Sequence, residues 1–280
     1  MAFISLNQLA SLKRRECVDF GRVDLGKLEK LVARQEPFSF VRFSDGEIEI
    51  LRNRPLVISG DIVEFRGRVF RNQFPPMDEK TFNPERHHSV RHALLKAAMF
   101  RAEKFFKGIP TSHNRVLRDR EFMLRLHGGY TEQVTFSDLF VNENYLYARD
   151  NFFPMLISKF KDILIIGNWR CQPRDQLRDA KLIGVRDNFF VDFDETRSHI
   201  VENIIDAPTG SLILSSASSL SNIIGLDLFK TRPDLTFLDV GTAINHLLGL
   251  PSMTRAYHKL AKNNIKGLGY RLSTEYRLKW

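Results

Sequence analysis

The sequence predicts an α/β protein with one doubly wound domain and a mainly parallel sheet. The second half contains four short runs that are apolar almost throughout, at 162–168, 181–187, 211–217 and 235–241. Helical patterns separate the last three runs, at 194–205 and 219–230. Short apolar strands that alternate with helices are typical of a parallel sheet covered on both faces. We therefore expect a single Rossmann-like domain over residues 1–280, with a core at 24–250 and a basic tail at 251–280.

The first half is less regular, and its elements are predicted one at a time. A helix at 24–36 precedes an opening strand at 38–43. The segments 55–60 and 63–72 have the composition of two strands of a hairpin. The longest helix is expected at 88–108, where a glycine ahead of a proline ends it. A last helix is expected to begin after Gly241.

Composition restricts the class of protein and of partner. The 280 residues include 42 Lys and Arg against 33 Asp and Glu, a formal charge of +9. This balance favours nucleic acid, phosphorylated small molecules or an anionic membrane surface as partners. No apolar run approaches the ~18 to 20 residues of a membrane span, and the N-terminal segment lacks the pattern of a secretion signal. With two cysteines and no CxxC pair, we expect reduced thiols and a cytoplasmic location.

Small, polar and acidic residues follow the predicted strands. In open α/β sheets, ligands bind beyond the carboxyl ends of the strands. The residues expected at that edge are Ser44, Asp45 and Glu47, then Gly167 and Asn168, then Arg186, Asp187 and Asn188, then Ser215 and Ser216, and last Asp239 and Gly241. Their chemistry predicts a polar ligand.

The stretch Asp45-Gly46-Glu47 is the first candidate site, because it follows a strand directly. Two carboxylates at this spacing can hold Mg²⁺ or Mn²⁺ while phosphate oxygens of a substrate complete the coordination. Arg42, a residue type suited to phosphate, lies beside the same edge. The alternative is a turn in which Asp45 caps a helix and Glu47 lies in its first turn.

Other motifs compete with this one. Asp192 and Asp194 have the same spacing but precede a helical pattern, so helix capping also explains them. His87, His88 and His92 include an i, i+4 pair with no third ligand at a zinc-like spacing. The serines at 215–219 open a helix that can receive a phosphate, or they allow tight packing. The absence of GxGxxG and GxxxxGK[ST] disfavours a dehydrogenase or a P-loop NTPase.

The tail at 251–280 is strongly basic. It holds seven Lys or Arg, one acid and four aromatic residues. Basic residues interleaved with aromatics can bind nucleic acid or a membrane surface. The alternative is a terminal helix docked on the domain with its charges in water.

The segment SFVRFSDGEIEIL resembles the signature of the GT-D-type bacterial glycosyltransferases, an apolar strand followed by Arg-Phe/Tyr-Gly-Asp-Gly-Glu. The motif here runs from Arg42 to Glu47, with Ser44 in place of the first glycine. Further similarities follow in order at 108–110, 161–168, 186–190, 211–228 and 237–249. The last, FLDVGTAINHLLG, resembles an Asp-Ile-Gly strand end of that family.

The resemblance implies a GT-D-type fold and the transfer of a sugar from a nucleotide-sugar donor, usually a UDP-sugar, to a glycan or lipid-linked acceptor. It places Asp45 and Glu47 at a Mn²⁺ or Mg²⁺ site that binds the donor diphosphate. The remaining donor contacts are expected from Arg42, Ser44, Gly46, Asn168, Asn188, Ser215, Ser216 and Gly241.

The chain also departs from the family. Ser218-Ser219-Leu220 stands where many members have Gly-Pro-Thr, and Asn245-His246 stands where many have acids. The catalytic base is therefore expected to be either Asp239 or His246.

Two other functions compete with sugar transfer. One is a non-catalytic protein that binds anions or nucleic acid, and the other is a metal-dependent phosphohydrolase. We expect no specific nucleic-acid partner. A further expectation is peripheral contact with the inner face of the membrane through 251–280.

Overall fold

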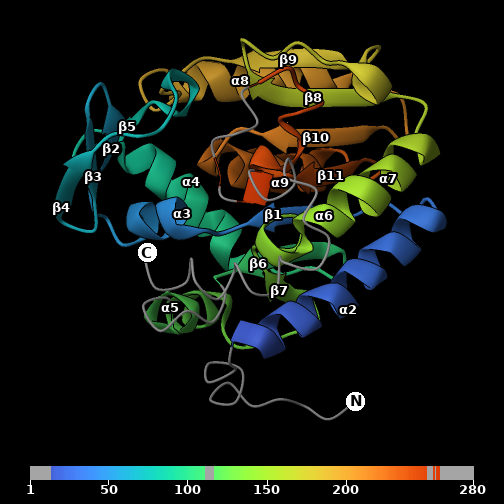
Figure 1. Ribbon diagram of the computed structural model, residues 1–280, viewed down its shortest axis with the longest axis horizontal. Helices are drawn as coiled ribbons and strands as arrows, with labels where there is room; N and C mark the ends of the chain where they lie inside the picture. Colours follow the sequence, from blue (N-terminus) through green and yellow to red (C-terminus); the bar gives the residue numbers. More distant parts are fainter. Residues whose placement is uncertain (1–13, 111–116, 251–254, 256, 259–280) are drawn as a thin grey trace.

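The computed structural model describes residues 14–110, 117–250, 255, 257 and 258. A seven-stranded sheet forms its centre, in the order β7-β6-β1-β11-β10-β8-β9 (Figure 1). Every pair of neighbours in this sheet is parallel. The strands are β1 (Ser39–Arg42), β6 (Phe105–Ile109), β7 (Val134–Phe136), β8 (Ile163–Asn168), β9 (Lys181–Val185), β10 (Leu212–Ser216) and β11 (Thr236–Asp239).

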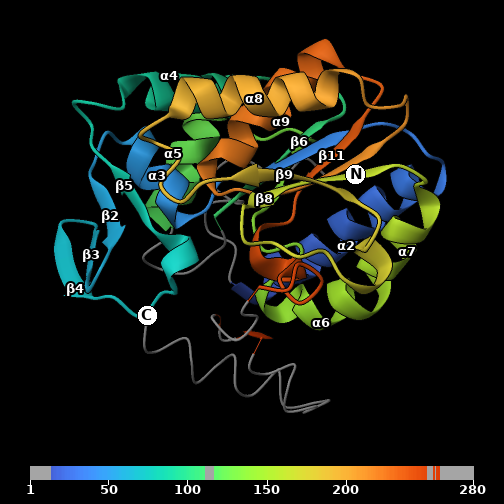
Figure 2. The ribbon, with the colours of Figure 1, turned by 90° about the horizontal axis from the view of Figure 1, so that it is seen from above.

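Helices cover both faces of this sheet (Figure 2). One face carries α4 (His88–Met99), α8 (Phe193–Ile205) and α9 (Ser219–Thr231), with α3 (Asp45–Leu51) and α5 (Leu117–His127) beside α4. The other carries α2 (Arg14–Ala33), α6 (Tyr145–Tyr147), α7 (Phe153–Lys159), the π-helical turn η3 (Ala148–Phe152) and the 3₁₀ turns η2 (Asn142–Asn144), η4 (Asp175–Leu177) and η5 (Gly241–Ile244).

Two separate apolar cores result from this arrangement. Val41 points to the core under α4, α8 and α9, whereas Phe40 points to the core under α2 and α7. Successive side chains of a strand alternate between the faces, and both faces here are buried. This explains why the strands are continuously apolar, and it confirms the predicted doubly wound α/β fold.

A second, antiparallel sheet stands apart from the first, in the order β4-β3-β2-β5. It consists of β2 (Leu56–Ser59), β3 (Ile62–Phe65), β4 (Arg68–Arg71) and β5 (Lys80–Phe82), and the 3₁₀ turn η1 (Pro76–Asp78) precedes β5. The predicted strands at 55–60 and 63–72 are confirmed, although the second is itself two strands. The turn at Arg66 and Gly67, both with positive φ, divides it.

The predicted helix at 88–108 is wrong in its second half. Helix α4 ends at Met99, Phe100 is extended, and β6 begins at Phe105. Gly108 is not a helix end, because it pairs with β1 and β7. A Cβ there would lie 2.9 Å from the Cα of Ser137, so the close approach of the next strand requires glycine.

Two other helix boundaries differ from the prediction. The chain after Gly241 makes only the 3₁₀ turn η5. The N-terminal helix starts ten residues before Asp24, at Arg14, and is longer than α4. In the described part of the chain, no helix is long and apolar enough to cross a membrane.

Helix α9 lies directly on the centre of the sheet, and Gly225 permits this contact. A Cβ at Gly225 would lie 2.6 Å from Cγ1 of Val41 and 2.8 Å from Cε1 of Phe237. Both partners are buried strand residues with no room to move. A side chain of any size at 225 must therefore push the helix away from β1 and β11.

We predict that Gly225→Ala lowers the free energy of unfolding by about 1–3 kcal/mol, because an extra methyl overpacks the core. Urea denaturation measures the change. The control is Gly26→Ala in α2, where a Cβ has no neighbour closer than 4.0 Å. That substitution should stabilise by about 0.5–1 kcal/mol through helix propensity. Equal effects of the two substitutions would contradict the prediction.

Candidate functional site at the carboxyl edge of the sheet

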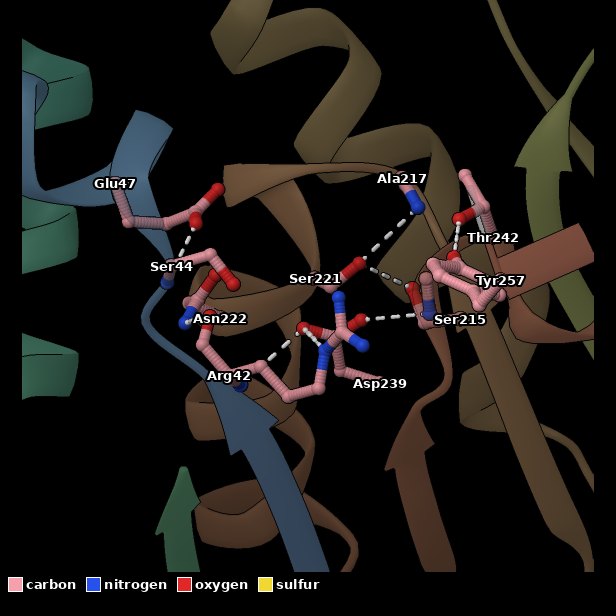
Figure 3. A network of polar contacts seen from close by, with 11 residues as sticks. Arg42, Ser44, Glu47, Ser215, Ala217, Ser221, Asn222, Asp239, Thr242 and Tyr257 are labelled. Carbon is pink, nitrogen blue, oxygen red and sulfur yellow. Dashed lines mark hydrogen bonds and ion pairs between the residues drawn. The ribbon is translucent and has the colours of Figure 1, made fainter. Parts of the chain in front are cut away.

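The carboxyl ends of β1, β11 and β10 meet in the middle of the sheet (Figure 3). Ser215 is in register with Asp239, and Arg42 ends β1 on the other side of β11. Because parallel strands end at the same edge, residues far apart in sequence lie together here.

Arg42 and Asp239 are the central contact of this edge. The backbone N–H of Arg42 donates to Oδ2 of Asp239 at 3.2 Å, and the Nε of Arg42 lies 3.7 Å from the same oxygen. The N–H of Gly241 donates to Oδ1 at 3.1 Å. Burial raises the pKa of Asp239 to about 6, although the Arg42 charge and both backbone donors oppose the shift. The carboxylate is thus held in one orientation by β1 and by the turn η5 that follows its own strand.

Gly241, predicted as a donor contact, leaves room for the side chain of Arg42. Its φ of +50° favours glycine, and an added Cβ would lie 2.9 Å from Cζ of Arg42. The guanidinium therefore lies directly against the Gly241 backbone. Its Nε and Nη1 are buried and have no hydrogen-bond acceptor among the described residues. A partly buried guanidinium with two unused donors is suited to bind phosphate oxygens.

Helix α3 starts at this edge, and its first turn carries the predicted carboxylate pair. Ser44, not Asp45, is the N-cap residue, and Glu47 Oε2 accepts from the Ser44 N–H at 2.9 Å. Asp45 is exposed, and its Oδ1 accepts from the Gly46 N–H at 3.0 Å. The capping geometry weighed for this turn is therefore present, with Glu47 as its acidic member.

Glu47 is nevertheless an unusual capping residue, because it is buried. Burial raises its pKa to about 7; Lys80 opposes the shift, and the nearby charges of Asp239 and Asp45 add to it. Two other carboxyl groups thus act on Glu47 at the ends of two neighbouring strands. A cation at this point would relieve both their repulsion and the cost of burying Glu47.

The protein alone does not form a complete metal site there. Among residues 14–110, 117–250, 255, 257 and 258, no group of three His, Cys, Asp or Glu is placed to hold an ion. Mg²⁺ is usually bound by one or two carboxylates and completed by substrate phosphates and water. Asp45 and Glu47 fit that type of site, in which the ligand supplies the remaining oxygens.

The serines after β10 form an internal network. The Oγ atoms of Ser215 and Ser221 are 2.8 Å apart, and Ser221 Oγ also accepts from the Ala217 N–H at 3.1 Å. Asn222 donates to the Arg42 carbonyl at 2.7 Å, which ties α9 to β1. Ser215 is fully buried, whereas Ser216 is partly exposed at the edge. Tight packing, one of the two interpretations of these serines, explains Ser215.

Lys80 reaches this edge from the antiparallel sheet, and sequence reasoning did not identify it. Its Nζ donates to Ser218 Oγ at 3.1 Å, and Ser218 has a φ of +53° before α9. Lys80 thus brings a cation between Glu47 and the start of α9. It lies in a strand of a different sheet, so no local pattern in the sequence relates it to the site.

Asn168 and Asn188 lie at the ends of β8 and β9 and have protein partners. Asn168 Nδ2 donates to Asp187 at 2.7 Å, and Asp187 also binds Arg170 at 2.6 Å. Asn188 Oδ1 accepts from the Thr81 N–H at 2.8 Å, which fastens the loop after β9 to β5. These contacts explain both residues structurally; a donor contact by either remains a prediction.

His246 follows η5 and is partly buried. Its charged neighbours are Arg149, Asp150 and Asp175, and burial together with Arg149 lowers its pKa. These neighbours belong to η3 and η4, on the α2 and α7 side of the sheet. Asp239 lies beside Arg42 instead. The geometry therefore groups Asp239, rather than His246, with the carboxylate pair.

The rival sites have structural explanations in the described chain. Asp192 is the N-cap residue of α8 and lies 3.8 Å from Arg186, and Asp194 belongs to the first turn. His87 Nδ1 accepts from the Asn83 N–H at 2.9 Å, and its ring stacks on Phe190. His88 and His92 are exposed on α4.

The beginning of the tail packs close to the Arg42–Asp239 pair. Tyr257 hydrogen-bonds through its hydroxyl to Thr242, and its ring centroid is 4.8 Å from that of Tyr145. His258 Nε2 donates to the Thr242 carbonyl at 3.0 Å. Both Tyr257 and His258 are buried. The other tail residues of the basic segment, apart from Arg255, lie outside the described residues.

The fold is similar to solved structures that share little sequence with this chain. A selenomethionine-substituted structure of the domain of unknown function 1792 has a TM-score of 0.50 and 16% identity, covering 85% of this chain and 87% of that one. A second structure of that domain, described as having a distinct glycosyltransferase fold, has a TM-score of 0.48 at 16% identity and covers 80% and 81%. A third, described as a new glycosyltransferase from Streptococcus sanguinis, has 0.49 at 16% and covers 85% of each. No family model and no curated protein matches this chain.

We predict that Glu47→Gln makes the protein more stable at alkaline pH. The folded-state pKa of about 7 lies above the ordinary value of 4.5, so ionising Glu47 costs folding free energy as pH rises through that range. Glutamine keeps the hydrogen-bond acceptor without the charge. Relative to wild type, the gain should be small at pH 4.5, grow to roughly 3 kcal/mol near pH 7 and then level off.

Urea unfolding at several pH values measures this gain. The matched control is Glu103→Gln, which removes an exposed glutamate and should show no such rise. If the difference in free energy of unfolding between Glu47→Gln and wild type does not change with pH, burial does not raise the pKa of Glu47.

Proposed function

We propose that this protein is a metal-dependent glycosyltransferase that moves a sugar from a nucleotide-sugar donor, a UDP-sugar by preference, to a glycan or glycoconjugate acceptor. The observation that carries the proposal is the meeting of two features at one edge of the sheet. These are the carboxylates of Asp45 and Glu47 and two donors of Arg42 that have no hydrogen-bond acceptor among the described residues. The resemblance of residues 38–51 to the GT-D signature supports it. So does the fold shared with the domain of unknown function 1792.

The proposed chemistry follows from the charges at this edge. Bound Mn²⁺ or Mg²⁺, held by Asp45 and Glu47, would neutralise the charge that develops on the leaving nucleotide. Arg42 offers Nε and Nη1 to the donor phosphates, and the Gly241 backbone and Asp239 fix its position. The guanidinium is therefore pre-oriented, which reduces the entropy lost when a phosphate binds.

Asp239 is our candidate for the base that takes the proton of the acceptor hydroxyl. With a pKa of about 6 it is ionised at neutral pH and close enough to neutrality to accept a proton. Its oxygens keep lone pairs free after accepting the Arg42 and Gly241 N–H groups. The same group also positions Arg42, so its replacement should affect donor binding as well as turnover.

We predict that UDP stabilises the wild-type protein only when Mn²⁺ is present, by about 2.7 kcal/mol at a concentration 100 times the dissociation constant. Asp45→Asn and Glu47→Gln should each abolish the metal-dependent part of this effect. Thermal-shift measurements with UDP, GDP and CMP, with and without Mn²⁺, provide the readout.

The double variant Asp192→Asn/Asp194→Asn is the control, because it alters the other carboxylate pair of equal spacing. It should respond to UDP and Mn²⁺ like wild type. If stabilisation by UDP and Mn²⁺ survives in Glu47→Gln but is lost in this control, the metal site lies at the start of α8 instead. Nucleotide binding that ignores metal and falls steeply with salt would support the non-catalytic anion-binding alternative.

The basic tail is the part of the chain that we propose to contact the acceptor or the membrane surface. Lys and Arg near an anionic surface contribute ~1 kcal/mol each. Deletion of residues 263–280 should therefore reduce co-sedimentation with vesicles that contain phosphatidylglycerol. Unchanged co-sedimentation combined with a lower melting temperature would show that the tail only stabilises the domain.

A further inference from the structure

A second positively charged site lies at the far end of α3. A cavity of about 620 Å³ opens there between α3, α4 and α5, and we call it the arginine cavity. Its lining consists of Leu51, Arg52, Arg54, Arg91, Arg118, Glu121, Phe122 and Arg125. Five of these eight residues are arginines and one is acidic. Its size falls within the range of small-ligand sites.

The arginine cavity is separate from the carboxyl edge of the sheet. Helix α3 has Asp45 and Glu47 in its first turn and ends at Leu51, which lines the cavity. A helix of seven residues is about 10 Å long, so the two sites lie at opposite ends of one short helix.

Part of this positive charge has a structural explanation. Arg52 lies 2.9 Å from Asp119 and donates to the Arg118 carbonyl at 3.1 Å. Arg91 Nε donates to the Leu51 carbonyl at 3.1 Å, which satisfies the end of α3. Arg54 lies 3.9 Å from Glu49 and is about half exposed. These contacts account for the position of three of the five arginines.

The remaining charge is not explained by folding. Within the described chain, the guanidinium groups of Arg118 and Arg125 have no carboxylate partner, and neither do the terminal nitrogens of Arg91. Arg118 and Arg125 are both exposed and lie seven residues apart on α5, so they project from the same side of that helix. The lining as a whole carries five positive charges against the single negative charge of Glu121, so it attracts anions.

We propose that the arginine cavity binds a phosphate-rich group, such as a diphosphate, on a ligand or lipid headgroup. Guanidinium forks match phosphate oxygens with two parallel hydrogen bonds, and several of them suit a multiply charged anion better than a single carboxylate. Single-stranded nucleic acid is disfavoured, because the one aromatic ring in the lining, Phe122, is already covered by Arg52 at 4.8 Å.

Inorganic pyrophosphate is the first probe, titrated calorimetrically into the full chain at fixed ionic strength with EDTA present. Wild type should bind it, and Arg118→Gln/Arg125→Gln should bind about tenfold more weakly. The matched control, Arg34→Gln/Arg178→Gln, removes the same charge from exposed positions outside the cavity and should change the affinity less than twofold. Equal weakening in both double variants, or no binding to wild type, would overturn the proposal.

Two further variants separate fold and site effects. Arg118→Lys/Arg125→Lys keeps the charge and loses the fork, so an intermediate affinity is expected. Arg42→Gln removes the guanidinium that the carboxyl edge offers to phosphate, so pyrophosphate binding that survives in this variant in EDTA comes from another site. If Arg42→Gln abolishes this binding, the anion occupies the sheet edge and the arginine cavity is not a site, whatever the outcome for sugar transfer.

Vesicles distinguish the source of the phosphate. Co-sedimentation with phosphatidylcholine vesicles that contain phosphatidic acid, but not with pure phosphatidylcholine, should be lost in Arg118→Gln/Arg125→Gln if a lipid headgroup is the ligand. Pyrophosphate binding without such co-sedimentation assigns the cavity to a soluble phosphorylated ligand. Absence of both would refute the proposal.

Discussion

The buried pair of Arg42 and Asp239 joins the two central strands of the sheet at the edge where the candidate site lies. An ion pair that is largely removed from water stabilises a protein only when its geometry is good and its other polar atoms are satisfied. Here Asp239 is well satisfied by two backbone N–H groups, while Arg42 keeps two buried nitrogens without acceptors. The imbalance leaves hydrogen-bond donors of Arg42 unused, whereas both carboxylate oxygens of Asp239 are engaged. A bound phosphate would accept from these donors, which links the stability of this edge to ligand binding.

Glu47 shows the opposite imbalance. It is a carboxylate in the first turn of α3, and burial raises its pKa to about 7. The nearby charge of Lys80 opposes this shift only in part. Natural proteins retain such costly groups at functional sites, where strain is useful. A substitution that stabilises the fold and removes metal-dependent binding would be the expected signature of a residue kept for chemistry rather than for folding.

Much of the fold follows from local patterns. The structure contains all four strands predicted in the second half, with small shifts of their ends, at 162–168, 181–187, 211–217 and 235–241. A short apolar run between polar ends is typical of a buried strand in an α/β protein. The predicted helix at 88–108 is wrong in its second half. Phe105 and Phe106 continue the helical pattern, but their pairing with β1 makes them a strand. The pairing of β1 with β11, a long-range contact, is not encoded in either segment alone.

The residues of the candidate site could be brought together from the sequence only where they are close in the chain. The motif from Arg42 to Glu47 lies on one strand and one helix, so the sequence shows it directly. Lys80, Asn222 and Tyr257 reach the same edge from other elements, through contacts at large sequence separation. Conversely, Asn168 and Asn188 have the right position at strand ends, yet their side chains bind protein partners. The type of residue at a strand end does not reveal whether its side chain is already hydrogen-bonded to a neighbouring loop.

The order of the strands also has a consequence for how the chain is made. Strand β1 pairs with β6 on one side, but its other neighbour, β11, follows 197 residues later at the Arg42–Asp239 contact. At about 5–20 residues per second, a ribosome needs roughly 10–40 s to supply it. During that time the open edge of β1 exposes unpaired backbone groups beside apolar side chains, the form of surface that aggregates. The central sheet therefore cannot close before β11 is synthesised, and a chaperone bound to the open edge of β1 in this interval would prevent aggregation.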